Sequence, residues 1–309
     1  MLALIKGHSG VELRSTDPPK PGSGEVVVKV MCAGLCRTDV YVAQGLLGTE
    51  SPRILGHECS GVVCRLGPDT RSSRLGDRVA VFPWLGCGYC EFCRDEPTGY
   101  LCPERQFLGR DVDGCFAEFM AVPERCCVAL PEQLSWQAGA YLEPLTAALS
   151  VLKTPVRQAA RLGVLGDNRI AALTRLVLKE FGKCEPVQVT DEAANTFDLI
   201  VESEATEKSL HRALSLLKPD GVLVLKSRPA ENVRWPLRLQ VEKEITTIGV
   251  SYGSLKMATL LLSKNHTLFA PLWNEPTPID DWSEAFEAEL KGEEARKSFF
   301  LPQEHPCAV

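Results

Sequence analysis

The sequence lacks a long apolar run, a run of lysine and arginine, and any internal repeat or low-complexity tract. Without about 20 consecutive apolar residues, no segment predicts a membrane-spanning helix. The amino-terminal MLALIKGHSGVEL carries Lys6 within a stretch too short for a signal peptide. A net charge of −6 argues against a nucleic-acid-binding surface. We therefore expect a cytoplasmic protein that acts on a small molecule, without nucleic-acid or membrane partners.

Two kinds of pattern divide the chain. Residues 1–147 contain short β-rich pieces between glycine and proline turns, such as EVVVKVMCAG, CSGVVCRLG and GDRVAVFP. Residues 148–267 alternate apolar strands with amphipathic helices, among them RLGVLG, NRIAALTRLVLKEFG, FDLIVES, SLHRALSLLK and GVLVLKS. That alternation indicates a parallel sheet flanked by helices. We expect an α/β protein with a β-rich domain over 1–147, rejoined by 268–309, and a Rossmann-like domain over 148–267.

Thirteen cysteines are many for a chain without a recognisable export signal, and they point to metal ligands or buried thiols before disulfides. Four form the pattern C-x2-C-x2-C-x8-C, namely Cys87, Cys90, Cys93 and Cys102. Thiolates at this spacing can surround one tetrahedral Zn2+. Four reduced cysteines in a loop and an iron–sulfur cluster are the alternatives. Because four sulfurs leave no open coordination position, we expect this site to hold a loop and to do no chemistry.

Three further motifs carry a second set of zinc-ligand types: GLCRTD at 34–39, GHE at 56–58 and YLEP at 141–144. Cys36, His57 and Glu143 are a thiolate, an imidazole and a carboxylate, a set that binds Zn2+ and leaves a position for water or substrate. Each alone has a plainer reading, such as a core thiol or a hydrogen-bonded structural histidine. Together they indicate an open metal site.

The motifs GLCRTD, GHECSG, GDRV, C-x2-C-x2-C and EP resemble the zinc-dependent medium-chain alcohol dehydrogenase superfamily, which includes sorbitol and threonine dehydrogenases. The resemblance covers residues 1 to about 150 in close register and the remainder loosely. It implies a GroES-like zinc-binding catalytic domain followed by a Rossmann-like domain. It also implies two zinc ions per chain, NAD or NADP as cofactor, and a homo-oligomer, either a dimer or a tetramer.

The resemblance also implies roles for single residues. Cys36, His57 and Glu143 would bind the catalytic zinc, and the four clustered cysteines would bind a structural zinc. Glu58 would either approach the catalytic metal or lie beside it. Asp39 would accept a hydrogen bond from the other ring nitrogen of His57 and so orient the ring.

Two further residues of the GLCRTD motif take roles from the resemblance. Thr38 would pass on the substrate's proton, and Arg37 would face the cofactor's pyrophosphate. Many members end the proton relay with a histidine a few residues later. This chain has VYVAQG in that segment, so Tyr41 is the nearest candidate.

The stretch GVLGDNRIAALTR at 163–175 departs from the dinucleotide fingerprint G-x-G-x-x-G/A at one position, because Gly166, Asn168 and Ala171 occupy the three sites. The second glycine normally lets the backbone approach pyrophosphate. Asparagine tolerates a positive φ, but its amide fills space that a phosphate would enter. The following helix still offers N–H groups for an anion. The alternative is a strand–helix turn that binds no ligand.

A six-residue link, DEAANT at 191–196, joins the expected strands PVQVT and FDLIVES. Parallel neighbours need a crossover of about a dozen residues, so a helix and a strand of the family's fold are missing here. In the usual strand order the link must cover roughly 19 Å, against about 20 Å for six extended residues. It therefore runs nearly straight across the sheet, or PVQVT leaves its usual place. Asp191 stands where an acid often binds the adenosine ribose of NAD; the alternative is a solvated loop.

Three hypotheses on function follow. The first is a zinc-dependent oxidoreductase that interconverts a small alcohol and its carbonyl by hydride transfer with NAD(P). The second is a non-redox zinc enzyme on the same scaffold, of the lyase, hydratase or cyclase type, with weakened or lost dinucleotide binding. The third is a non-catalytic binding or assembly protein. The segment EITTIGVSYGS at 244–254 is either an edge strand that supports oligomerisation or an interior strand.

Overall fold

The computed structural model describes all residues except 96–98, 183–184, 230, 293–295 and 303–309. The chain forms two compact units, one of Met1–Glu143 with Thr259–Val309 and one of Pro144–Ala258. The chain passes between them inside two helices, α4 (Leu142–Ala148) and α8 (Leu255–Phe269). The boundaries expected from the sequence, 147/148 and 267/268, fall inside the same two helices.

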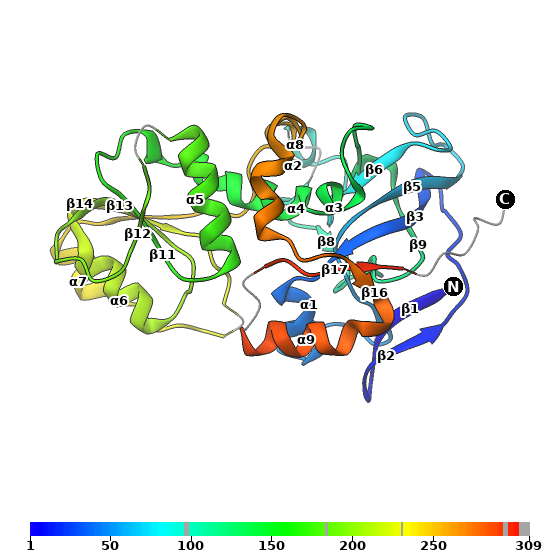
Figure 1. Ribbon diagram of the computed structural model, residues 1–309, viewed down its shortest axis with the longest axis horizontal. Helices are drawn as coiled ribbons and strands as arrows, with labels where there is room; N and C mark the ends of the chain where they lie inside the picture. Colours follow the sequence, from blue (N-terminus) through cyan, green and yellow to red (C-terminus); the bar gives the residue numbers. More distant parts are fainter. Residues whose placement is uncertain (96–98, 183–184, 230, 293–295, 303–309) are drawn as a thin grey trace. The chain divides into compact units, whose positions relative to one another are not determined.

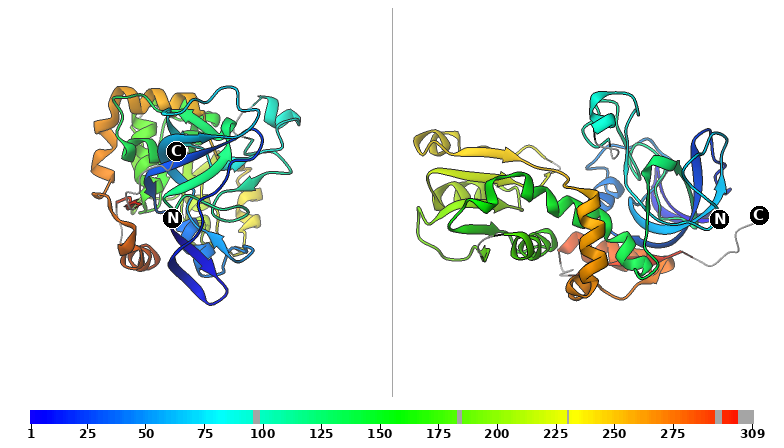
Figure 2. Two further views of the ribbon diagram at one scale, coloured as in Figure 1. Left: turned by 90° about the vertical axis from the view of Figure 1, so that its right-hand side faces the viewer. Right: turned by 90° about the horizontal axis from the view of Figure 1, so that it is seen from above.

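The first unit, which we call the β-rich unit, is built on a seven-stranded sheet in the order β10-β6-β5-β3-β17-β16, with β9 also paired to β3. A separate three-stranded sheet has the order β2-β1-β4, and β7 pairs with β8. Figure 2 shows the β1–β2 hairpin in dark blue. The strands are β1 (Leu2–Gly7), β2 (Gly10–Ser15), β3 (Glu25–Gly34), β4 (Arg53–Ile54), β5 (Glu58–Leu66), β6 (Arg78–Val81), β7 (Trp84–Leu85), β8 (Gln106–Phe107), β9 (Phe119–Pro123), β10 (Cys127–Ala129), β16 (Thr277–Pro278) and β17 (Phe299–Leu301).

The valine-rich strand β3 organises this unit because it pairs with three other strands, β5, β9 and β17. Val26, Val28 and Val30 lie in its main hydrophobic core. The carboxyl-terminal tail joins the sheet through β17, which runs antiparallel to β3. Short helices connect the strands: α1 (Arg37–Ala43), α2 (Glu91–Asp95), α3 (Trp136–Ala140), α9 (Trp282–Lys291) and the 3-10 turns Glu124–Cys126, Ala270–Leu272 and Ile279–Asp281.

The second unit contains a five-stranded parallel sheet in the order β12-β11-β13-β14-β15. Figure 1 shows α6 and α7 side by side, with α5 on the other side of the strands. The elements are β11 (Leu162–Leu165), α5 (Arg169–Phe181), β12 (Val187–Gln188), β13 (Phe197–Glu202), α6 (Glu207–Leu216), β14 (Leu217–Leu225), α7 (Leu237–Glu242) and β15 (Thr246–Gly249), preceded by 3-10 turns at Leu149–Lys153 and Pro155–Arg157. The expected α/β class, with a β-rich domain and a parallel Rossmann-like sheet, is confirmed.

The link after β12 crosses the sheet, as the chain-length argument requires for the usual strand order. Residues 189–196 are described and contain no helix, and β11 lies between β12 and β13. The expected strand at 186–190 is shorter than predicted, since only Val187 and Gln188 form it. Val189 still donates a hydrogen bond to the Val164 carbonyl at 3.0 Å before the chain turns away. A strand that ended later would leave fewer residues for the crossing.

Within the segment at 244–254, Thr246–Gly249 form β15, which pairs with β14 alone and is an edge strand within the described residues. The helices that the structure describes include none with the length and apolar character needed to cross a membrane.

Candidate metal centres and cofactor turn

The four clustered cysteines bring their sulfurs together in one loop. The Sγ atoms of Cys87, Cys90, Cys93 and Cys102 all lie within 4.8 Å of one another. Two of the separations are 3.5 Å, between Cys90 and Cys93, and 3.9 Å, between Cys87 and Cys93. A zinc–sulfur distance of about 2.3 Å gives sulfurs about 3.8 Å apart in a tetrahedron. The cluster therefore fits a four-coordinate Zn2+.

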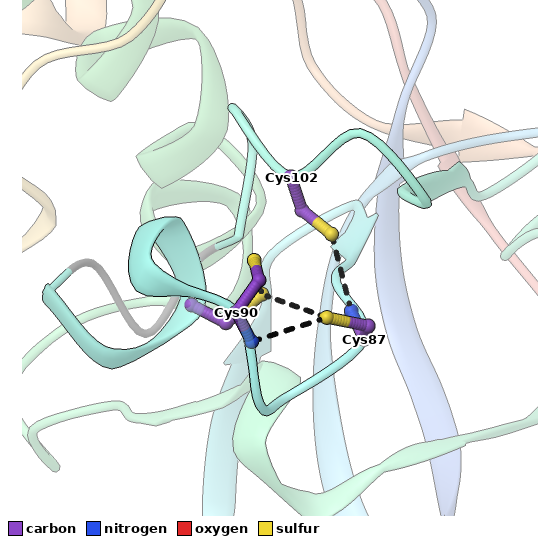
Figure 3. A group of neighbouring side chains, drawn as sticks. Cys87, Cys90 and Cys102 are labelled. Atoms are coloured by element: carbon purple, nitrogen blue, oxygen red, sulfur yellow. Dashed lines mark hydrogen bonds between the residues drawn. The ribbon is translucent and has the colours of Figure 1, made fainter.

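Backbone groups shape this cluster. Figure 3 shows the side chains of Cys87, Cys90 and Cys102 directed toward one another, with backbone N–H groups donating to sulfur. Desolvation raises the pKa of the Cys87 thiol, but N–H donors from Tyr89 and Cys90 lower it to about 6, which favours the thiolate. Gly86 must lack a side chain, because a Cβ there would lie 2.5 Å from the Cys93 sulfur.

A second group consists of Cys36, His57 and Glu58, whose ligand atoms also lie within 4.8 Å of one another. The sheet explains this proximity: Gly34 at the end of β3 is paired with Glu58 at the start of β5. Cys36 follows β3 by two residues and precedes α1, while His57 immediately precedes β5. His57 and Glu58 are almost fully buried, with 2% and 1% exposure.

Asp39 ties the two motifs together. Its Oδ2 accepts a hydrogen bond from the Cys36 N–H at 2.9 Å, and its Oδ1 accepts from the Gly56 N–H at 3.2 Å. Oδ1 also lies 2.9 Å from His57 Nδ1. Burial lowers the pKa of His57, but the charge and hydrogen bond of Asp39 outweigh it and raise that pKa well above its ordinary value. Asp39 thus fixes the ring with Nε2 as the nitrogen left for a metal.

Glu58 is paired with a residue that the sequence patterns did not single out. Lys297 Nζ donates to Glu58 Oε1 at 2.6 Å and lies 2.5 Å from Oε2, and both side chains are buried. Lys297 precedes β17, whose pairing with β3 brings it to this position. Gly34 makes room for the pair, because a Cβ there would lie 2.5 Å from Glu58 Oε2. The sequence feature that could have pointed to this ion pair is a lysine two residues before the apolar run FFL at 299–301.

Glu143 lies in the first turn of α4 and is 6% exposed. It is close enough for its charge to act on Glu58: burial raises the pKa of Glu58, Lys297 opposes this, and Glu143 raises it further. Among the described residues, however, the compact metal-ligand group contains Glu58 and not Glu143. A thiolate, an imidazole and a nearby carboxylate suit Zn2+, and the two carboxylates are alternatives for the third ligand.

The remaining predicted residues of the β-rich unit lie around this group. Thr38 Oγ1 is 3.8 Å from the Cys36 sulfur. The Arg37 side chain is half exposed, with its Nε 4.0 Å from Glu289 Oε1. Tyr41 lies on α1 and is partly buried. Thr38 is thus the hydroxyl placed beside the metal-ligand group.

The cofactor turn of the second unit begins at Gly166, which has a φ of +128°, as a tight turn requires. Asn168 has a φ of −140° and is the N-cap of α5, so it does not use the positive φ that asparagine tolerates. Asp191 is fully exposed, and its Oδ1 is 4.0 Å from a nitrogen of Arg212.

The chain is similar in sequence to known proteins. The alcohol dehydrogenase GroES-like domain family matches residues 22–132. Sorbitol dehydrogenase of Bacillus subtilis is 32% identical over 186 residues, covering 58% of this chain and 52% of that protein. L-threonine 3-dehydrogenase of Pyrococcus horikoshii is 28% identical over 346 residues, covering 97% of this chain and 99% of that protein.

Solved structures share the fold. Galactitol-1-phosphate dehydrogenase of Escherichia coli has a TM-score of 0.84 and 21% identity, covering 98% of this chain and 100% of that one. At this level of identity the likeness concerns the arrangement of the chain rather than its chemistry.

Proposed function

We propose that the chain is a zinc-dependent oxidoreductase of the medium-chain alcohol dehydrogenase type, which interconverts a small alcohol and its carbonyl by hydride transfer with NAD or NADP. The family match over residues 22–132 and the similarity to sorbitol and L-threonine dehydrogenases support this proposal. The observation that carries the proposal is the group of the half-buried Cys36 with the buried His57 and Glu58, beside the Thr38 hydroxyl. A zinc ion held there would act as a Lewis acid toward the alcohol oxygen, and the nicotinamide would take the hydride.

The chain's own residues prepare this chemistry. Cys36 supplies a thiolate and His57 supplies Nε2, while Asp39 holds both through its two carboxylate oxygens. Glu143 or Glu58 supplies the carboxylate. Thr38, next to Cys36, is the group to which the alcohol's proton passes. Burial of His57 and of both glutamates keeps bulk water from weakening their electrostatic interactions.

The four-cysteine cluster takes a different part. We propose that it holds the second zinc ion, with all four positions filled by Cys87, Cys90, Cys93 and Cys102. A closed site of this kind stabilises its loop and binds no substrate. The intact protein should therefore contain two zinc ions per chain.

A direct spectrophotometric assay of cofactor reduction tests the proposed function. The purified, zinc-loaded protein should reduce NAD+ or NADP+, measured as absorbance at about 340 nm, with an alcohol from a panel that includes sorbitol and threonine, the compounds named in its relatives. Metal analysis should give about two zinc per chain. Two bound zinc ions without any cofactor reduction across a broad panel of alcohols, and without cofactor oxidation by the matching carbonyls, would contradict the redox proposal.

We propose a homo-oligomer that forms through β15. This strand leaves one edge unpaired within the described residues, and such an edge offers its N–H and C=O groups to a second copy. Light scattering after size-exclusion chromatography should give a dimer or tetramer. Thr247→Pro, which removes a backbone donor from the edge strand, should shift the protein toward the monomer. Unchanged mass for this variant would place the interface elsewhere.

The zinc sites also support a reducing compartment. Cys36 and the four clustered cysteines bind metal only as thiolates, and oxidising compartments convert such thiols into disulfides. We therefore propose that the protein works in the cytoplasm.

A further inference from the structure

The sheet order locates the crevice in which a parallel α/β unit binds a ligand. After β11 the chain adds β12 on one side of that strand, and it then crosses over to add β13 on the other side. The switch point of the sheet therefore lies between β11 and β13. Ligands bind outside the carboxyl ends of the strands at such a point. Here those ends lead into the turn at Gly166 and the turn at Ser203. The inference below concerns this crevice and rests on the proposed use of NAD(P).

The two turns are joined by side-chain hydrogen bonds. Asn168 Nδ2 donates to the Ser203 carbonyl at 2.9 Å, and Ser203 Oγ donates to the Leu165 carbonyl at 2.9 Å. The Ser227 hydroxyl, after β14, donates to the same Ser203 carbonyl. We call the Asn168–Ser203 pair the latch. Ser203 is 1% exposed, while Asn168 is half-buried, so the latch lies at the edge of the buried turn.

The latch fills the space of the fingerprint's first glycine. A Cβ at Gly166 would lie 2.2 Å from Ser203 Oγ and 3.3 Å from Asn168 Nδ2. The backbone at this turn is therefore already covered by side chains of the same chain. A pyrophosphate approaches the backbone at the second position of the fingerprint, which Asn168 itself occupies in this chain.

Three backbone donors beside the crevice also have internal acceptors. Asn168 Oδ1 accepts the Ala171 N–H at 3.0 Å, one of the groups that the start of α5 would offer to an anion. After β13, the buried carboxylate of Glu202 accepts the N–H groups of Glu204 at 2.8 Å and Ala205 at 2.7 Å through Oε1. Both turns at the switch point thus satisfy donors with internal acceptors.

We propose that Asn168 is a built-in competitor of pyrophosphate, which holds the dinucleotide crevice closed through the latch. Binding of NAD(P) then requires the Asn168 amide to leave both Ser203 and the Ala171 N–H. A glycine at 168 removes the amide and frees the N–H. Asparagine thereby sets the affinity of this chain for dinucleotides below that of a glycine-bearing turn.

Direct binding tests this assignment. Isothermal titration with NADH, NADPH and ADP-ribose, which carries the pyrophosphate without the nicotinamide, should show that Asn168→Gly binds about tenfold more tightly than the unmodified protein, or about 1.4 kcal/mol. Asn168→Asp keeps the cap acceptor but places a negative charge near the phosphates, so it should bind less tightly than the unmodified protein. Ser135→Gly removes the equivalent cap of α3, in which Ser135 accepts from the Ala138 N–H, and should leave affinity unchanged.

The outcomes separate the two proposals. The latch is wrong if Asn168→Gly binds the probes no more tightly than the unmodified protein does, while its melting temperature is near that of Ser135→Gly. In that case, measurable binding by the unmodified protein still supports the proposed use of NAD(P). Tighter binding by Asn168→Gly for ADP-ribose and NADH alike supports the latch. If neither the unmodified protein nor Asn168→Gly binds any of the three probes at millimolar concentration, both the latch and the use of NAD(P) are wrong.

Discussion

The Cys36→Ala variant should retain one of two zinc ions and lose at least about a thousandfold in kcat/KM for the alcohol substrate. Removal of Cys36 leaves His57 and a carboxylate, which are too few protein ligands for a stable catalytic zinc. Such a metal supplies several kcal/mol of charge stabilisation, and each 1.36 kcal/mol is a factor of ten in rate. Metal analysis of the purified variant and steady-state kinetics measure the two effects.

Two cysteine variants serve as controls. Cys64→Ala alters a thiol on β5 that belongs to neither ligand group, so it should keep both zinc ions and full activity. Cys90→Ala should lose the other zinc and lower the melting temperature, because the loop then loses its metal support. Two zinc ions in Cys36→Ala, or activity close to that of Cys64→Ala, would contradict the assignment of the open site.

Local sequence patterns predicted individual strands, helices and links of this protein well. The strand EVVVKVMCAG is β3 from its first residue to its last, and the helix after Gly166 is α5. The link at 191–196 could be placed because chain reach depends only on residue number. Such features depend on neighbours in the sequence, so residue type and spacing suffice to find them.

The details of the site depend on residues far apart in the chain, and they were harder to predict. Lys297 meets Glu58 across 239 positions, through the pairing of β17 with β3. Asn168 Nδ2 donates to the carbonyl of Ser203, 35 positions later, a contact that no fingerprint includes. The choice between Glu58 and Glu143 likewise rests on how β5 and α4 approach one another. Spacing identifies ligand types, but the tertiary packing selects among them.

Lys297→Met should lower the free energy of unfolding of the β-rich unit by about 3–5 kcal/mol, since it leaves the buried carboxylate of Glu58 without its cation. Methionine has a similar length and keeps most of the packing. Adding Glu58→Gln should recover much of the loss, because the uncompensated charge is gone. Chemical denaturation followed by tryptophan fluorescence reports mainly on this unit, which holds four of the five tryptophans: Trp84, Trp136, Trp273 and Trp282.

An exposed ion pair provides the matched control. Lys291 and Glu287 of the same unit lie 3.9 Å apart with side chains 57% and 72% exposed, so Lys291→Met should cost less than about 1 kcal/mol. The same variant measured with and without zinc tests whether Glu58 binds the metal. If it does, zinc replaces the lost cation, and Lys297→Met is less destabilising in the zinc-loaded protein than after chelation. If Glu143 alone completes the site, zinc does not reduce the loss. A loss in Lys297→Met no larger than that in Lys291→Met would show that burial of the Glu58–Lys297 pair contributes little to stability.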